Sequence, residues 1–283
     1  MRLRRHLVSG IIAIVVVSFL WAPLLMTALN ALNRDELATR WGGATLRWFR
    51  QALANPDARS GLATALKIAV GSSLASAVIA VTGAMWWRGA TPRGRRVFDV
   101  LTYMRIIMPE VVFAVALFLL FTKIGVPLGA LAVIAGHTVW NSAYATLIVQ
   151  SRVITLDPIL EDAAADLGAT PVRAFWRVTL PILLPAVAAA ALLAFTFSFD
   201  DLVTSFYMSG TRIETLPVVL LSMIRFRLSP QINAIGIAVM ATTVVSVSLL
   251  YFLLSRNAQR GRSGALPAPI SFEVDAPVTR PGR

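Results

Sequence analysis

Six long apolar stretches, almost free of charged residues, constrain this chain more than any other feature of its sequence. A helix needs about 20 mostly apolar residues to cross roughly 30 Å of bilayer hydrocarbon. Charged residues make up only 14% of the chain, and they gather in the segments between the stretches. The sequence therefore predicts an all-α, polytopic membrane protein with about six transmembrane helices. The stretches are residues 7–29, 68–87, 106–121, 128–150, 182–199 and 232–254.

The net charge of +12 would suit a nucleic-acid-binding protein, but its distribution indicates membrane topology instead. Lys and Arg in short loops hold those loops in the cytoplasm. Arginines precede the first stretch, fill the loops after the second and fourth, and follow the sixth, whereas the loop after the third offers only Lys123. We therefore expect a multi-pass protein of the bacterial inner (cytoplasmic) membrane, with both termini cytoplasmic and no nucleic-acid partner. Because the chain has no cysteine, thiolate chemistry is excluded, and no cofactor or metal site is expected.

The predicted cytoplasmic loop 151–181 has the sequence pattern of two short helices joined at a glycine. Asp157 and the proline after it are typical of a helix start. Gly168 is placed to end that helix in a left-handed conformation. Thr170 and its following proline repeat the helix start, and the second helix is predicted to end at Pro181. The loop therefore predicts a helix–glycine–helix elbow that faces the cytoplasm.

This elbow resembles the EAA loop of ABC-importer permeases, whose pattern is E-A-A-x-x-x-G, then nine residues, then I-x-L-P. Asp162 stands where the family has glutamate, with Glu161 adjacent to it. The resemblance implies that the elbow docks on a separate ATPase subunit and couples it to transport. The residues that match the pattern are Asp162, Ala163, Ala164, Gly168, Val178, Leu180 and Pro181, and the predicted ATPase-coupling residues are Glu161, Asp162, Ala163, Ala164, Asp166 and Gly168.

The resemblance to that family implies a type I ABC importer permease architecture and a set of partners. These are two copies of an ATP-binding ABC subunit, a second homologous permease subunit, an external or periplasmic substrate-binding protein and membrane lipid. The chain itself is expected not to be an enzyme, because neither of its two lysines, Lys67 and Lys123, follows a glycine as a phosphate-binding loop requires.

A division of the chain into four parts follows from the spans and the resemblance. We expect a cytoplasmic N-terminus with the first transmembrane helix over 1–30, an external loop over 31–60, a permease core with spans 2–6 over 61–254, and a disordered cytoplasmic tail over 255–283.

Several further stretches resemble the spermidine/putrescine-type branch of these permeases. They are residues 195–210, 216–217 and 225–234, with Pro109-Glu110 and His137-Thr138. The branch implies a small organic solute, polyamine-like in character.

Three acidic residues fall inside or at the edge of predicted spans, where an ionisable group is costly and usually faces a cavity or a partner. Glu110, Asp200 and Asp201 either line a translocation path for a cationic solute or are structural. In the structural alternative Glu110 is neutralised by Arg105, and the aspartates cap the start of an external loop. The full set of predicted path residues is Glu110, His137, Asn141, Ser198, Asp200 and Asp201.

An ion-gradient-driven secondary transporter of a small solute is the alternative function. Such carriers typically contain inverted repeats with broken helices at matched positions. The sequence shows no such repeat, and this alternative leaves the capped elbow without a role.

Overall fold

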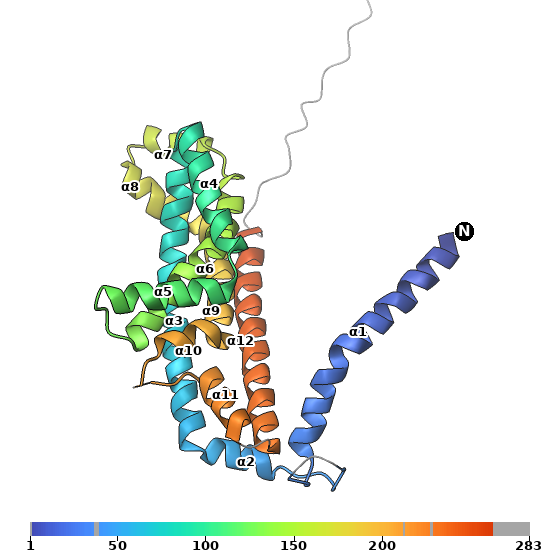
Figure 1. The fold of residues 1–283 in the computed structure, drawn as a ribbon. Helices are drawn as coiled ribbons and strands as arrows, with labels where there is room; N and C mark the ends of the chain where they lie inside the picture. Colours follow the sequence, from blue (N-terminus) through green and yellow to red (C-terminus); the bar gives the residue numbers. More distant parts are fainter. Residues whose placement is uncertain (1, 37–39, 212, 227–228, 263–283) are drawn as a thin grey trace, which may run out of the picture.

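The computed structural model describes residues 2–36, 40–211, 213–226 and 229–262 (Figure 1). Every regular element in these ranges is helical, which confirms the predicted all-α class. The elements are α1 (Arg2–Leu32), α2 (Arg47–Ala54), α3 (Pro56–Gly89), α4 (Pro92–Ile107), α5 (Glu110–Lys123), α6 (Ala130–Val153), α7 (Ile159–Asp166), α8 (Pro171–Ala174), a π-helical turn (Phe175–Thr179), α9 (Leu180–Asp200), α10 (Val203–Met208), α11 (Leu216–Phe226) and α12 (Pro230–Arg262).

The six predicted stretches fall in α1, α3, the pair α4 and α5, α6, α9 and α12. Within the described ranges, three helical segments are long and apolar enough to cross a membrane unbroken: Gly10–Leu32, Pro56–Gly89 and Pro171–Phe199. The pair α4 and α5 meets the same requirement only as a bent span. Helix α6 is less apolar because it carries several buried polar side chains, among them His137 and Asn141.

Small side chains form the centre of the bundle, where α3, α6 and α9 pack against one another. Ala80, Ala84, Ala145 and Ala190 are almost completely buried there, beside Leu183. Small residues let helix backbones approach closely, which matters in lipid because the hydrophobic effect does not drive one membrane helix onto another. Most of helix α1 leans away from this bundle in Figure 1 and is exposed, whereas its C-terminal end packs against α12 and α2.

The third predicted span is not one helix but two, bent by 104° at a short break. Pro109 lies in the break, and Met108 before it has the extended backbone that a following proline favours (φ −63°, ψ 129°). Proline also has no N–H to continue the hydrogen bonds of α4. The predicted third span, 106–121, is therefore interrupted at the proline that it contains.

The elbow and the predicted external loop lie at opposite ends of the molecule. Figure 1 shows α7 and α8 at one end of the long helix α3, and α2 and α11 at the other. Trp48 of α2 is buried (4% exposed) and donates a hydrogen bond to the carbonyl of Asn33 at 2.6 Å, so it is part of the protein interior. At the C-terminal end, α12 continues to Arg262, past the predicted start of the tail, and residues 263–283 lie outside the described residues.

Candidate functional site

The two helix starts of the elbow are capped as the sequence predicted. The carboxylate of Asp157 accepts a hydrogen bond from the backbone N–H of Ile159 at 3.0 Å, at the beginning of α7. The hydroxyl oxygen of Thr170 accepts one from the N–H of Arg173 at 3.4 Å, at the beginning of α8. Each cap satisfies an N–H that has no partner inside its own helix.

The turn between the two helices depends on Gly168, which has a φ of +80°. The N–H groups of Gly168 and Ala169 donate to the carbonyls of Ala165 and Ala164, at 2.8 and 2.9 Å. These paired bonds make up the Schellman motif, in which the left-handed residue is usually glycine. The predicted left-handed end of the first helix is confirmed.

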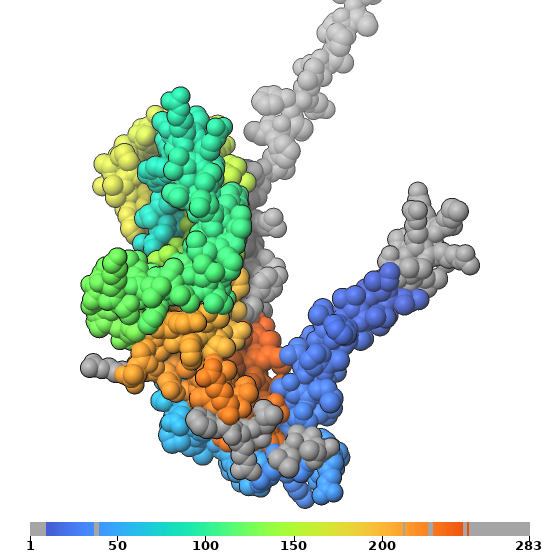
Figure 2. Space-filling view, in the orientation of Figure 1, coloured from blue at the N-terminus to red at the C-terminus, as the bar shows by residue number. Residues whose placement is uncertain are grey.

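The outer surface of the elbow carries exposed apolar and acidic side chains next to each other. Leu167 is 90% exposed, and Ala163, Asp162 and Asp166 are exposed as well. Figure 2 shows this segment, in yellow, at one extremity of the molecule. A shallow recess of about 240 Å³ adjoins it, lined by Ala164, Leu167, Ala169, Arg173, Ala174, Arg177 and Val178.

The second helix of the elbow does not end at Pro181, which corrects the sequence prediction. Helix α8 continues through the π-helical turn into α9, and the N–H of Leu180 bonds to the carbonyl of Phe175, five residues back. Pro181 in the first turn of α9 has no N–H and would crowd a regular α-helical turn before it. The wider turn removes that conflict, so the elbow is joined to α9 without a loop.

Glu161 ties α7 to two other elements. Its Oε1 accepts a hydrogen bond from Nη1 of Arg88 in α3 at 2.8 Å and one from Oγ1 of Thr179 at 2.6 Å. Partial burial would raise the pKa of Glu161, but the hydrogen bonds from Thr179 and Arg88 outweigh it and hold this pKa below its ordinary value. This contact therefore adds stability above the ordinary carboxyl pKa, and the contribution is lost as pH falls through the lowered value.

The predicted acidic path residues line one cavity of about 510 Å³ between α5, α6 and α9. Glu110, Asp200 and Asp201 all border it. The remaining lining residues are Trp140, Tyr144, Thr196, Phe197, Leu202 and Val203. Carboxylates facing aromatic rings are the groups that bind organic cations.

His137 lies behind this cavity, in a chain of hydrogen bonds that joins three helices. Ser72 of α3 donates to Oγ of Ser198 at 2.8 Å, and Ser198 Oγ lies 2.6 Å from Nδ1 of His137. Nε2 of His137 lies 3.2 Å from Oδ1 of Asp201. An ionised Asp201 carboxylate can only accept, so this contact places a proton on Nε2. His137 is only 1% exposed. Through its contact with Asp201, this row of hydrogen bonds holds the Asp201 carboxylate in place from the side away from the cavity.

Asn141 is buried away from the cavity, and its Nδ2 donates to the carbonyl of Ala194 at 3.2 Å. Of the six predicted path residues, three therefore line the cavity, while His137, Asn141 and Ser198 support the helices around it. Sequence reasoning missed the aromatic wall. The i, i+4 spacing of Trp140 and Tyr144 on α6 was the available signal, because residues at that spacing share a helix face.

Arg105 does not neutralise Glu110 in the manner that the sequence suggested. Among the described residues, the ion pairs shorter than 4 Å do not include Arg105. Its guanidinium carbon lies instead 3.8 Å from the ring centroid of Phe113 and 3.7 Å from that of Trp140. The 104° break turns α5 away from α4, so the five-residue separation no longer brings the two charges together.

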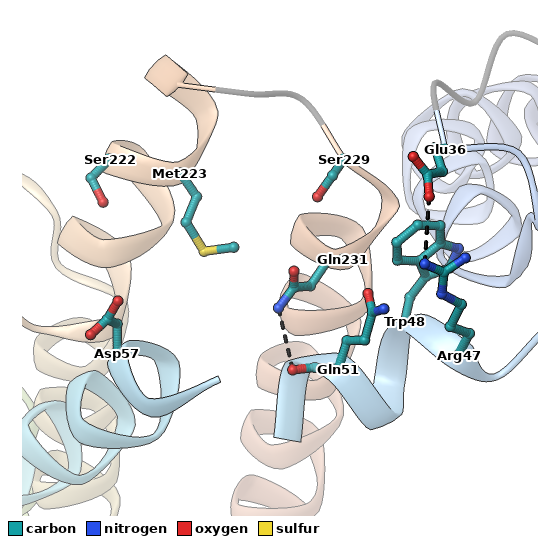
Figure 3. A pocket seen from close by; sticks show the side chains of 9 residues that line it. All are labelled: Glu36, Arg47, Trp48, Gln51, Asp57, Ser222, Met223, Ser229 and Gln231. Atoms are coloured by element: carbon teal, nitrogen blue, oxygen red, sulfur yellow. Dashed lines mark hydrogen bonds and ion pairs between the residues drawn. The ribbon is translucent and has the colours of Figure 1, made fainter. Parts of the chain in front are cut away.

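A second cavity, of about 560 Å³, lies at the N-terminal end of α3, far from the elbow, and is drawn in Figure 3. Its charges are of both signs, and Nη2 of Arg47 lies 3.5 Å from a carboxylate oxygen of Glu36. Gln231 donates to the carbonyl of Gln51 at 3.3 Å. The predicted site residues do not line it. Its mixed charges give it no clear preference for a cationic or an anionic solute.

Comparison with known proteins identifies the family. The family model described as "Binding-protein-dependent transport system inner membrane component" matches residues 79–262. The putrescine transport system permease protein PotI of Escherichia coli (strain K12) is 33% identical over 261 residues, covering 87% of this chain and 93% of PotI. The spermidine/putrescine transport system permease protein PotC of Haemophilus influenzae is 30% identical, covering 86% of this chain and 92% of PotC.

Solved structures share the fold. A chain of a bacterial ABC transporter involved in the import of the acidic polysaccharide alginate superposes with a TM-score of 0.68 at 16% identity, covering 89% of this chain and 95% of that one. A chain of the MetNI methionine ABC transporter in an inward-facing conformation gives a TM-score of 0.57 at 18% identity, covering 71% and 94%. The family match and the two transport relatives favour the importer over the gradient-driven carrier. The chain belongs to the family of binding-protein-dependent transport system inner membrane components, as a multi-pass permease subunit of a bacterial ABC importer and not an enzyme.

Proposed function

We propose that this permease carries a small organic cation of the polyamine class through the cavity lined by Glu110, Asp200 and Asp201. The observation that carries the proposal is the pairing of three carboxylates with three aromatic rings in one cavity inside the bundle. The relatives named above belong to putrescine or spermidine/putrescine transport systems. These solutes are organic cations, which carboxylates and aromatic rings bind favourably.

Physical chemistry explains why such a cavity suits a polyamine. An ammonium group loses its hydration when it enters the membrane region, and that loss is costly unless carboxylates and polarisable faces replace the water. Trp140, Tyr144 and Phe197 supply aromatic faces, and a ring can contribute about 0.5–2 kcal/mol to the binding of a cation. A neutral or anionic solute gains neither interaction, so we expect it to be rejected at this point.

The elbow formed by α7 and α8 is the proposed docking element for the ATPase. Glu161, Asp162, Ala163, Ala164, Asp166 and Gly168 are its proposed coupling residues. We propose that the complete importer contains two ATP-binding subunits, a second homologous permease and an external substrate-binding protein. In this arrangement both termini and residues 151–181 are cytoplasmic, 31–60 are external, and spans 2–6 form the permease core.

Movement at the elbow has two direct routes into the bundle. The continuous backbone from α8 through the π-helical turn leads into α9, which ends at Asp200. The hydrogen bonds of Glu161 lead to Arg88 in α3. Closure of the ATPase pair therefore moves α3 and α9 together, and α9 lines the cavity with α5 and α6.

Uptake by the reconstituted importer tests the substrate class. The complex, extracted from its native membrane with its ATPase and second permease, is placed in proteoliposomes with the binding protein outside. We expect ATP-dependent uptake of labelled putrescine or spermidine, and none of a neutral sugar or a dicarboxylate of similar size. Uptake of the dicarboxylate in preference to both polyamines would refute the proposal.

A charge exchange tests the role of Glu161. We expect Glu161→Arg or Arg88→Glu alone to lower the amount of solute moved per ATP hydrolysed several-fold, because each leaves two like charges in contact at the elbow. The double variant restores an attractive pair and should recover most of that ratio. Arg96→Glu is the control, since this exposed residue of α4 lies outside the elbow and does not contribute to this pair. If the Glu161→Arg complex keeps the ratio of the parent, the contact has no part in coupling.

A further inference from the structure

The environment of Arg105 is unusual for a charged side chain. It lies in the last turn of α4, beside the 104° break. Its guanidinium lies 3.8 Å from the ring centroid of Phe113 in α5 and 3.7 Å from that of Trp140 in α6. These two rings also contact each other, with centroids 5.5 Å apart and planes tilted by 49°. Because a guanidinium stacks well on aromatic faces, the tilted rings form a notch for one cationic group, called the slot below.

The polar atoms of this guanidinium are not satisfied by hydrogen bonds. All three of its nitrogens are buried, and none has a hydrogen-bond partner among the described residues. Buried donors without acceptors are costly, and a structural arginine normally finds carbonyls or carboxylates. Arg95, on the same helix, illustrates that ordinary arrangement, because it stacks on Trp87 and also donates to the carbonyl oxygens of Trp87 and Arg88.

The slot is continuous with the acidic cavity. Trp140 contributes to both, and Glu110, at the start of α5, lies close enough to act electrostatically on Arg105 without forming an ion pair. An alkylammonium or guanidinium group that entered the cavity would need an aromatic face and a nearby carboxylate. In this conformation Arg105 already occupies the aromatic half of that arrangement.

We propose that Arg105 is a tethered cation that occupies the slot between Phe113 and Trp140 in place of the cationic group of the solute, and that it leaves the slot when the solute enters. This inference rests on the proposed function, in which the cavity carries an organic cation. Arg105 is then a specificity-determining residue. It keeps free cations out of the empty permease and is displaced when the binding protein delivers solute at high local concentration.

The test removes the tethered cation and supplies a free one. The complex carrying Arg105→Ala is titrated with ethylguanidinium, and binding is followed as the rise in the midpoint of thermal unfolding. We expect ethylguanidinium to bind at least about tenfold more tightly than to the parent, since the vacated slot offers two ring faces. Arg95→Ala, which removes the arginine that has its own carbonyl acceptors, is the matched control and should bind like the parent.

The outcomes separate this inference from the proposed function. Equal binding of ethylguanidinium by Arg105→Ala and the parent would overturn the inference, because the slot would then not be a cation site. Tighter binding that putrescine competes away supports both proposals. Tighter binding that putrescine leaves unchanged supports the slot and refutes the polyamine assignment. Should Arg105→Ala fail to assemble, Arg105→Ser replaces it, since this variant also vacates the slot but keeps a polar group beside the break. It should bind putrescine about tenfold more tightly than the parent, and unchanged affinity would overturn the inference.

Discussion

Replacement of Gly168 by valine is expected to lower ATP-driven uptake by more than about tenfold while the rest of the chain stays folded. Gly168 has a φ of +80°, where an L-residue costs about 1–2 kcal/mol and a β-branched one more. A Cβ built at this position meets no atom within 4 Å, so the penalty comes from the backbone alone. The backbone is expected to relax and break the paired hydrogen bonds to Ala165 and Ala164, which turns α7 away from α8.

The chain offers a matched control for this substitution. Gly125, between α5 and α6, has a φ of +75° and is equally free of neighbours, so Gly125→Val carries the same backbone cost away from the elbow. We expect it to transport like the parent. Gly168→Asn should retain most activity, since asparagine tolerates the left-handed region. The measurement is ATP-dependent uptake together with recovery of the ATPase on purification, and normal uptake by Gly168→Val would remove the elbow from the coupling mechanism.

The two neighbouring aspartates are expected to respond very differently to neutralisation. Asp201 has a side chain 6% exposed, accepts a hydrogen bond from the N–H of Ser205 at 2.9 Å and lies 3.2 Å from Nε2 of His137. Asp200 is exposed to the cavity. Asp201→Asn should therefore lower both the thermal stability of the complex and the uptake rate, by tenfold or more for the rate, because hydrogen bonds to a charged group contribute about 1.5–3 kcal/mol each. Asp200→Asn should weaken uptake of putrescine several-fold with unchanged stability.

Thermal unfolding and concentration-dependent putrescine uptake, measured on both variants, distinguish a path role from a structural one. Loss of stability with normal uptake in Asp201→Asn would make that residue structural only. If both variants transport with the rate and apparent affinity of the parent, the acidic cavity is not the translocation path.

Local features of the sequence predicted the elbow well. The caps at Asp157 and Thr170 and the turn at Gly168 depend on residues within a few positions of each other, so their chemistry is present in the sequence itself. The same holds for the break before α5, which Pro109 marks. The bend of 104° was not predictable, because it depends on how α5 packs against α6 and α10 rather than on the proline.

Features that depend on packing between helices were missed. The predicted partner of Arg105 was wrong. The sequence shows how far Arg105 lies from Glu110 along the chain, but not that Trp140 of α6 packs against it. The chain of bonds from Ser72 through Ser198 and His137 to Asp201 needs the registers of α3, α6 and α9 together. Neither residue type nor spacing records those registers. The aromatic wall of the cavity was missed for the same reason.

The π-helical turn at Phe175–Thr179 restricts the changes in length that this segment of the protein can accept. A π-helical turn accommodates one residue more than the α-helical turn it replaces, and each residue of an α-helix advances by roughly 100° about the axis. Shortening this segment by a single residue would restore a regular helix and rotate the whole elbow by about that angle relative to α9. Thr179 would then point away from Glu161, and the recess beside Leu167 would face another direction. The number of residues between Ala174 and Leu180 therefore determines the direction in which the elbow faces. Substitutions in this segment are expected to be tolerated better than the insertion or deletion of one residue.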